Sequence, residues 1–156
     1  MLLISLGRLD EAVEIVGEIL ALNPRRAVAH QLLGRIHILR GQAKAALEEM
    51  GREPAEFWKR YGMNLALFAS GRHEEADAVL QELIDGVDGA SAYFQVAESM
   101  AFRGRHDEAF EWLEMAHEHR DNGITEMMTS PFLRPLHADA RWPAFLDKLG
   151  LRQSTG

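Results

Sequence analysis

A short sequence pattern recurs four times along this chain of 156 residues and constrains its fold more than any other feature. In its full form the pattern is Gly, Arg, any residue, an acidic residue, Glu and Ala, and the copies begin at Gly7, Gly41, Gly71 and Gly104. The copy at Gly41 keeps only the Gly and the Ala. Consecutive glycines are 34, 30 and 33 residues apart, close to the length of about 34 residues that a repeating helix–turn–helix unit needs. The pattern therefore predicts a chain of stacked helix pairs.

Each glycine lies between two helical patterns, where a helix has to end in a residue that tolerates a positive φ. The acidic residues fall in the first turn of the next helix, where they complement the positive end of its macrodipole. The Ala that follows them allows a close approach to the preceding helix. We therefore expect each copy to form a turn followed by a tight helix–helix contact.

A longer signature surrounds these turns. The second unit reads His30-x-x-Leu33-Gly34-x-x-His37, and the last reads Tyr93-x-x-Val96-Ala97-x-x-Met100. These spacings resemble the signature of the tetratricopeptide-repeat family. The third unit departs from it, because Asn64 stands where the family has a small residue, and the first unit is truncated. The resemblance implies an all-α, right-handed α-solenoid of antiparallel helix pairs.

The repeats are expected over residues 1–120, in about three and a half units. The unit that is four residues short has lost about one helical turn, and we place this loss in its second helix, over 43–50, because Gly51 and Pro54 end that helix early. Residues 121–151 are expected to form C-terminal capping helices, since solenoids need covered ends. Residues 152–156 are expected to be a flexible tail.

Within the cap we predict a short helix near Ile124–Met128, interrupted by Pro131 and Pro135. Asp139 should N-cap a final helix whose apolar residues recur at helical spacing from Trp142, and Gly150 should end it. The closing segment, 130–151, resembles the C-terminal end of bacterial multidomain proteins that carry these repeats.

Composition excludes several classes of function. The chain has 24 acidic and 17 basic residues and a formal charge of −7, which argues against nucleic acid as a partner. It has no cysteine, so neither a disulfide nor a thiolate metal site can form. The apolar start, Met1–Leu6, is too short to span a membrane. We therefore expect a soluble, cytoplasmic protein.

The seven histidines do not form a metal-binding pattern. His117 and His119 are two residues apart, which places them about 200° apart around a helix. His30 and His37 share a helix face, but they stand where the family packs aromatic residues, so we expect them to be buried and hydrogen-bonded. The paired carboxylates fall at solvent-facing spacings, and no nucleophile or phosphate-binding motif is present. We expect no metal, no cofactor and no catalytic residue, and hence no enzyme.

The remaining candidate is the groove. In a solenoid the first helix of each pair lines the inner surface, and residues one step from its core face would touch a partner. Aromatic and Arg side chains, which often dominate interface energy, are prominent among these residues. They are Val28, Gln31, Arg35, Ile38, Trp58, Tyr61, Leu65, Phe68, Ser91, Phe94, Glu98 and Phe102.

The alternative for Trp58 and Phe68 is that they belong to the core. Some family members hold the C-terminal carboxylate of a chaperone with a Lys–Asn clamp, but Gln31 and Arg35 stand at those positions here. That class of ligand is therefore not expected.

Two hypotheses about function follow. In the first, the chain is a scaffold that binds a peptide or helical segment of a protein partner in the groove. In the second, it is a structural module that self-associates through the apolar N-terminal edge at Leu2, Leu3, Ile4 and Leu6, or a fragment of a larger multidomain regulatory protein.

Overall fold

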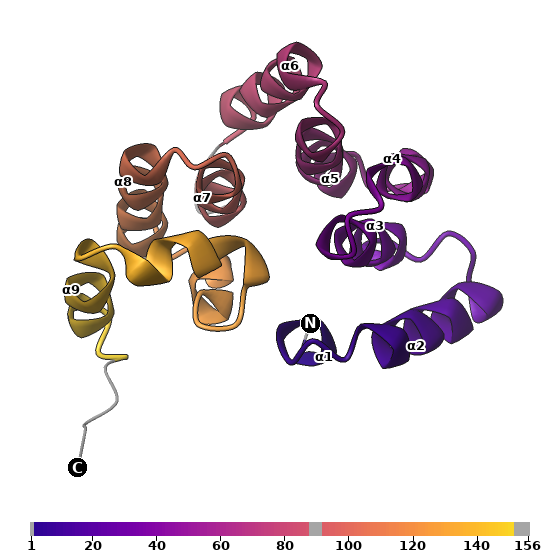
Figure 1. Ribbon diagram of the computed structural model, residues 1–156, viewed down its shortest axis with the longest axis horizontal. Coiled ribbons are helices and arrows are strands. Elements are labelled where there is room, and N and C mark those ends of the chain that lie inside the picture. The colour runs from indigo at the N-terminus through magenta and orange to yellow at the C-terminus, as the bar shows by residue number, and fades with distance from the viewer. Residues whose placement is uncertain (1, 88–91, 152–156) are drawn as a thin grey trace. The chain divides into compact units, whose positions relative to one another are not determined.

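A computed structural model describes residues 2–87 and 92–151, and every regular element within these ranges is a helix (Figure 1). The chain divides into two compact units, Met1–Val87 and Asp88–Gly156. The predicted all-α fold, built from helix pairs and a helical cap, is confirmed. Ser91 and residues 152–156, for which the sequence predicts a groove position and a tail, lie outside the described residues.

The first unit contains three helix pairs. They are α1 (Leu2–Ser5) with α2 (Leu9–Leu22), α3 (Ala29–Leu39) with α4 (Ala43–Arg52), and α5 (Glu56–Ala69) with α6 (His73–Asp85). Successive pairs are stacked, because α3 contacts α2 on one side and α5 on the other, and α4 also contacts α5. This packing leaves α3 and α5, the first helices of their pairs, side by side.

The second unit contains one helix pair and the cap. The pair is α7 (Tyr93–Phe102) with α8 (His106–Glu118). The cap consists of two 3₁₀ helices, η1 (Asn122–Glu126) and η2 (Pro131–Ala138), followed by α9 (Arg141–Lys148). Both 3₁₀ helices contact α7, and η1 also contacts α8. The cap therefore packs on both helices of the pair.

The recurrent glycines end helices as predicted. Gly7, Gly41, Gly71 and Gly104 all have a positive φ, between 71° and 80°. At Gly71 the backbone N–H donates to the Phe68 carbonyl, and the N–H of Arg72 donates to the Leu67 carbonyl, both at 3.0 Å. The same pair of bonds occurs at the other three glycines. This is the Schellman arrangement, which satisfies the last carbonyls of a helix.

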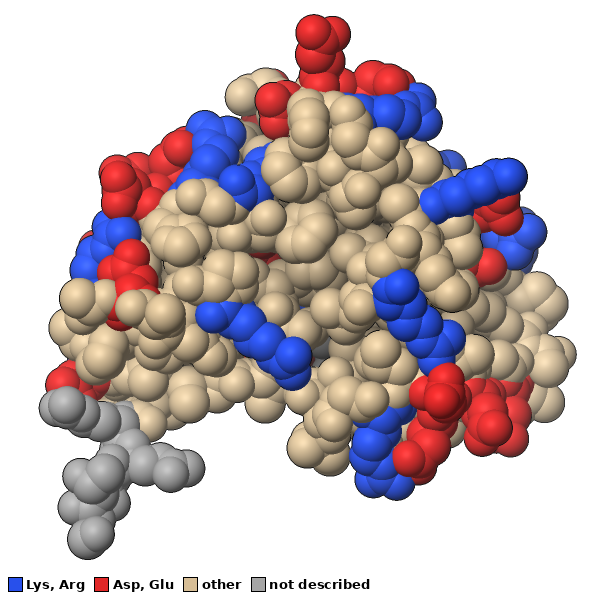
Figure 2. All heavy atoms as spheres, in the orientation of Figure 1, with Lys and Arg blue, Asp and Glu red and all other residues tan. Residues whose placement is uncertain are grey.

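The order of residues shared by the three full copies also has a physical basis. In the three full copies the Arg forms an ion pair with the Glu three residues later, as Arg72 does with Glu75. These pairs are exposed, and each contributes little to stability. Figure 2 shows acidic and basic side chains interspersed on the surface, as such local pairs require. The Ala of each copy is buried, with at most 5% of its surface exposed.

The short helix α4 packs on its neighbours through Met50. Helix α4 has 10 residues, whereas α2, α6 and α8 have 14, 13 and 13, so the shortened element is the second helix of this unit, as predicted. The helix does not end at Gly51, however, but continues through it to Arg52, just before Glu53 and Pro54. Met50 of α4 is fully buried and lies against Gly34 of α3 and Gly62 of α5. A Cβ at those glycines would lie 2.5 Å and 2.0 Å from atoms of the Met50 side chain. The two glycines therefore make room for Met50.

The cap differs in detail from its prediction. The segment around Ile124 forms a 3₁₀ helix that ends at Glu126 rather than an α-helix. Pro131 does not interrupt a helix but begins one, because a residue without an N–H is well suited to the first helical position. Asp139 does accept a hydrogen bond from the Arg141 N–H at 3.0 Å at the start of α9, although Ala140 is the residue that directly precedes the helix. Gly150 follows α9 with a φ of 68°.

Within the described residues, no helix combines the length and the apolar character that crossing a membrane requires.

Candidate functional site

The structure divides the eleven described groove candidates into two groups. Seven side chains are buried, with at most 8% of their surface exposed: Gln31, Arg35, Ile38, Tyr61, Leu65, Phe94 and Glu98. The other four are half-buried: Val28, Trp58, Phe68 and Phe102. Only the second group presents side-chain surface that a partner could reach without a rearrangement.

In the first unit, Trp58 is the centre of an aromatic cluster. Its ring meets those of Phe57 and Tyr61 edge-on, with centroid distances of 5.0 Å and 6.1 Å. The guanidinium of Arg35, on the neighbouring helix α3, lies 5.8 Å from the centroid of the Tyr61 ring. Such a contact is attractive, and more so where it is shielded from water. Tyr61 and Arg35 are thus a buried support for the half-exposed Trp58.

Gln31 lies one helical turn before Arg35 and is 1% exposed. Neither its side-chain nitrogen nor its side-chain oxygen has a hydrogen-bond partner among the described residues. An unsatisfied buried amide costs about 1–3 kcal/mol and calls for an explanation. The buried side-chain amide of Gln31 therefore lowers the stability of the packing in this region.

Phe68 is near the other end of α5 from Trp58 and pairs with His73, at a centroid distance of 4.6 Å. Ten residues along a helix correspond to about 15 Å. The structure therefore does not bring the two half-exposed aromatic residues of α5 into one cluster.

In the second unit, the candidates on α7 are covered by the cap. Phe94 packs so closely on Gly123 that a Cβ there would lie 2.6 Å from Phe94. The Ser130 hydroxyl donates to the buried carboxylate of Glu98, and Phe102 meets Phe132 edge-on at 5.4 Å. The sequence predicts that the cap covers the end of the last pair, but does not reveal that it also covers this face of α7. The chain thus contacts its own groove candidates here.

Two buried carboxylates were not singled out from the sequence. Glu53 is 2% exposed and accepts from the backbone N–H groups of Val28, Gln31 and Ala55 at 2.9–3.1 Å. Asp121 is 4% exposed and accepts from Phe94 and Gly123 at 3.1 Å and 2.8 Å. Both follow the second helix of a pair and reach back to the start of its first helix. The sequence offers no common spacing that would identify them, because Glu53 lies 12 residues after Gly41 and Asp121 lies 17 residues after Gly104.

The histidines at the aromatic positions are hydrogen-bonded, as predicted. His30 Nδ1 lies 2.7 Å from a carboxylate oxygen of Glu49, and His37 Nδ1 lies 2.7 Å from the side-chain oxygen of Gln42. The expected burial is wrong, however, because both rings are only half-buried. In the part of the chain that the structure describes, no three His, Asp or Glu side chains form a group that could hold a metal ion.

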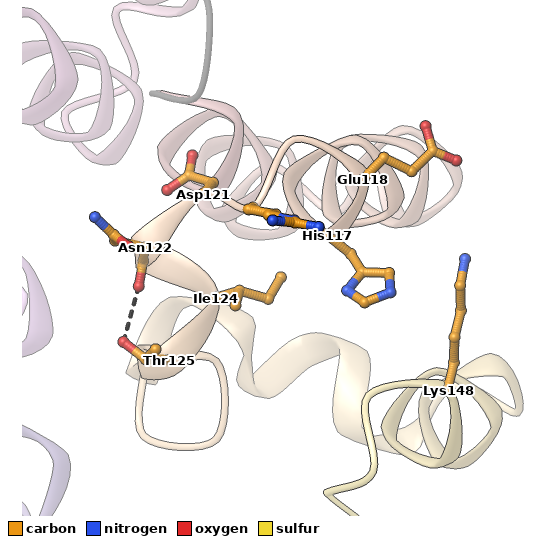
Figure 3. Close-up of a pocket in the computed structure, with 8 residues that line it drawn as sticks. His117, Glu118, Asp121, Asn122, Ile124, Thr125 and Lys148 are labelled. Atoms are coloured by element: carbon orange, nitrogen blue, oxygen red, sulfur yellow. Dashed lines mark hydrogen bonds between the residues drawn. The ribbon is translucent and has the colours of Figure 1, made fainter.

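The second unit also has an open hollow of about 650 Å³. His117 of α8, Asn122, Ile124 and Thr125 of η1, and Lys148 of α9 line it (Figure 3). The Thr125 hydroxyl donates to the Asn122 carbonyl at 2.8 Å, and the Asp121 carboxylate already accepts two backbone N–H groups. The Asp121 carboxylate and the Thr125 hydroxyl are therefore used within the fold of the second unit.

Comparison with known families gives a direct result. Two family models, both described as tetratricopeptide repeat, match the chain, one over residues 3–57 and the other over 63–82 and 90–115. Together they account for most of the chain up to the start of the cap. Neither the curated proteins nor the solved structures yielded a match.

Proposed function

Because this chain belongs to the tetratricopeptide-repeat family, whose repeats generally mediate contacts between proteins, we propose that it is a scaffold that binds a peptide or helical segment of a protein partner. We place the contact in the first unit, along α3 and α5, with Trp58 at its centre. The observation that carries this proposal is the half-exposed Trp58 on its buried support of Tyr61 and Arg35.

This arrangement suits binding for two reasons. Tryptophan is among the residues that most often dominate interface energy, because its large ring can be desolvated by a partner. The ring is also held by Phe57 and Tyr61 before any partner arrives. Less conformational entropy is then lost on binding.

The equivalent face of α7 is covered by the cap, which favours placing the partner contact in the first unit. There the cap already covers Phe94, Glu98 and Phe102 with its own residues. A partner segment would have to displace the cap to reach Phe94 and Glu98, and the half-buried Phe102 is partly covered by Phe132. We therefore restrict the proposed contact to the half-buried candidates of the first unit, Val28, Trp58 and Phe68.

A capture experiment tests the proposal. The full chain is immobilised and used to recover proteins from a lysate, in parallel with Trp58→Ala and with Met128→Ala, a control at an exposed apolar position outside the proposed contact. Partners recovered by the wild type and the control, but at least about tenfold less by Trp58→Ala, support the placement. Equal recovery by the wild type and both variants contradicts the placement of the contact at Trp58.

Self-association remains the alternative function, and exposed apolar residues favour it. Of the four residues of the predicted edge, Leu2 and Leu6 are 67% and 60% exposed, whereas Leu3 is half-buried and Ile4 is buried. Sedimentation of the purified chain over a range of concentrations separates the two functions, because a self-associating module gives a dimer without any partner.

A further inference from the structure

We propose that Asn122 is a site of spontaneous deamidation and that the carboxylate of Asp121 controls the rate of the reaction. The site lies in the second unit and is independent of the partner contact proposed around Trp58. The inference combines the residue that follows Asn122, the exposure of Asn122, and the hydrogen bonds that Asp121 accepts.

The reaction uses a backbone nitrogen as the nucleophile. The nitrogen of Gly123 attacks the side-chain carbonyl carbon of Asn122 and forms a C–N bond. The bond from that carbon to the amide nitrogen breaks, and ammonia leaves with the proton of the Gly123 N–H. One water molecule then opens the resulting cyclic imide at either of its two carbonyl carbons. The product is an aspartate or an isoaspartate, in which the main chain runs through the former side-chain carbon, and each adds one negative charge.

The chain has three Asn residues, and Asn122 alone meets the requirements of this reaction. Asn23 precedes Pro24, which has no N–H. Asn64 is 0% exposed, and its side-chain nitrogen donates to a backbone carbonyl at 2.6 Å. Asn122 is exposed, and Gly123 after it has no side chain that would hinder the attack or restrict the backbone.

Water has access to Asn122. Together with Thr125, it lines the open hollow of about 650 Å³ in the second unit (Figure 3). The water molecule that opens the imide can therefore reach it from the hollow.

Asp121 holds the attacking nitrogen in place. One oxygen of this buried carboxylate accepts from the Gly123 N–H at 2.8 Å, and the other accepts from the Phe94 N–H at 3.1 Å. The Thr125 hydroxyl also donates to the Asn122 carbonyl at 2.8 Å, which fixes the start of η1. The Gly123 nitrogen is free to attack only when η1 opens locally. The rate of deamidation therefore follows the fraction of molecules in which η1 is open.

Deamidation changes the contact between η1 and α7. Gly123 packs so closely on Phe94 that a Cβ there would lie 2.6 Å from the Phe94 side chain. An isoaspartate lengthens the main chain directly before this contact. The new carboxylate also lies next to that of Asp121 in the sequence, and like charges repel. The modified cap therefore packs less well on the start of α7, and a transient opening of η1 is converted into a lasting change.

Mass spectrometry of the full chain tests the proposal. The purified chain is incubated for weeks at neutral pH and physiological temperature, and peptide mapping locates each conversion of an amide to an acid. Asp121→Ala removes the acceptor of the Gly123 N–H. Glu53→Ala is the matched control, because it removes the buried carboxylate that holds the start of α3 in the first unit. Circular dichroism shows whether each variant is folded.

We expect conversion to be confined to Asn122. It should be about tenfold or more faster in Asp121→Ala, and in the wild type unfolded in urea, than in the folded wild type. Glu53→Ala should convert within about twofold of the wild-type rate, because its Gly123 N–H keeps its acceptor. If Asp121→Ala does not fold, the wild type below its urea unfolding transition takes its place, and conversion should rise there before the helical signal falls.

Three results overturn the inference. The first is that Asn122 stays unconverted both in Asp121→Ala and in the urea-unfolded chain. The second is that another Asn converts before Asn122. The third is that the substituted or urea-treated chain with an open η1 converts no faster than Glu53→Ala, since Asp121 would then not control the reaction.

Discussion

The carboxylate of Glu53 accepts hydrogen bonds from the backbone N–H of Val28 at 2.9 Å and ties the end of α4 to the start of α3. Val28 has a φ of 75°, a left-handed conformation that is costly for a β-branched residue. In the last pair Ala92, which directly precedes α7 as Val28 directly precedes α3, has a φ of 77°, and Asp121 accepts from the N–H of Phe94. A buried carboxylate thus accompanies each strained helix start.

Replacing Glu53 by Ala should therefore reduce the free energy of unfolding by about 1–3 kcal/mol, since three buried or half-buried N–H groups lose their acceptor. Urea denaturation measures the change. Glu48→Ala, at an exposed position of the same helix, is the control and should stay within about 0.5 kcal/mol of the wild type. Equal stability of the two variants would show that water replaces the carboxylate at no cost.

The repeat could be predicted from the sequence because its signals are local. A glycine that requires a positive φ, an acidic first turn and a buried Ala all lie within six residues, and each of the four copies adopts the expected turn. The 3.6-residue period likewise predicts helices without knowledge of their neighbours.

The site could be predicted less well, because burial depends on contacts between distant residues. Tyr61 and Phe94 are at groove-facing spacings, yet both are buried. Arg35 of the neighbouring helix lies over Tyr61, and the cap covers Phe94 from 29 residues further along, at Gly123. Neither contact produces a periodic signal in the sequence. The position of Trp58, half-exposed at the start of α5, likewise emerges only from the packing around it.

The contact of Met50 with Gly62 predicts an energetic coupling. Gly62→Ala should reduce the free energy of unfolding by about 1–3 kcal/mol through overpacking, less the gain in helix propensity of up to about 1 kcal/mol. Met50→Ala should cost about 2–5 kcal/mol by leaving a cavity. The new methyl group partly fills that cavity, so the double variant should be more stable than the sum of the two losses predicts, by about 0.5–3 kcal/mol. If the losses of unfolding free energy of the two single variants instead add up to that of the double variant, the packing of Met50 does not depend on the space at Gly62.

The start of α9 predicts a dependence of stability on pH. The guanidinium and backbone N–H of Arg141 hydrogen-bond the Asp139 carboxylate and hold its pKa well below the usual value. A pKa that is lowered in the folded state stabilises the fold above the unfolded pKa, near 4, and this stabilisation is lost as the pH falls toward the folded pKa. Asp139→Asn should therefore melt below the wild type at pH 7, and the difference should shrink as the pH falls from about 4 to 2. A difference that is constant over this range would exclude ionisation of Asp139 as its cause.

Substitutions of Trp58 and Tyr61, both on α5, test whether partner binding and folding stability depend on different residues. Tyr61 is fully buried beneath Arg35, so Tyr61→Ala should reduce the free energy of unfolding by about 3–5 kcal/mol. Trp58 is half-exposed, so Trp58→Ala should cost no more than about 2 kcal/mol but should weaken partner binding at least about tenfold. Tyr61→Phe, which keeps the ring, serves as a control that should retain both the ring packing and the binding.

Binding is compared in the folded fraction, at a temperature where circular dichroism shows every variant to be helical. If Trp58→Ala destabilises the chain as strongly as Tyr61→Ala and leaves the affinity of the folded fraction intact, Trp58 belongs to the core and the partner contact lies elsewhere on the chain.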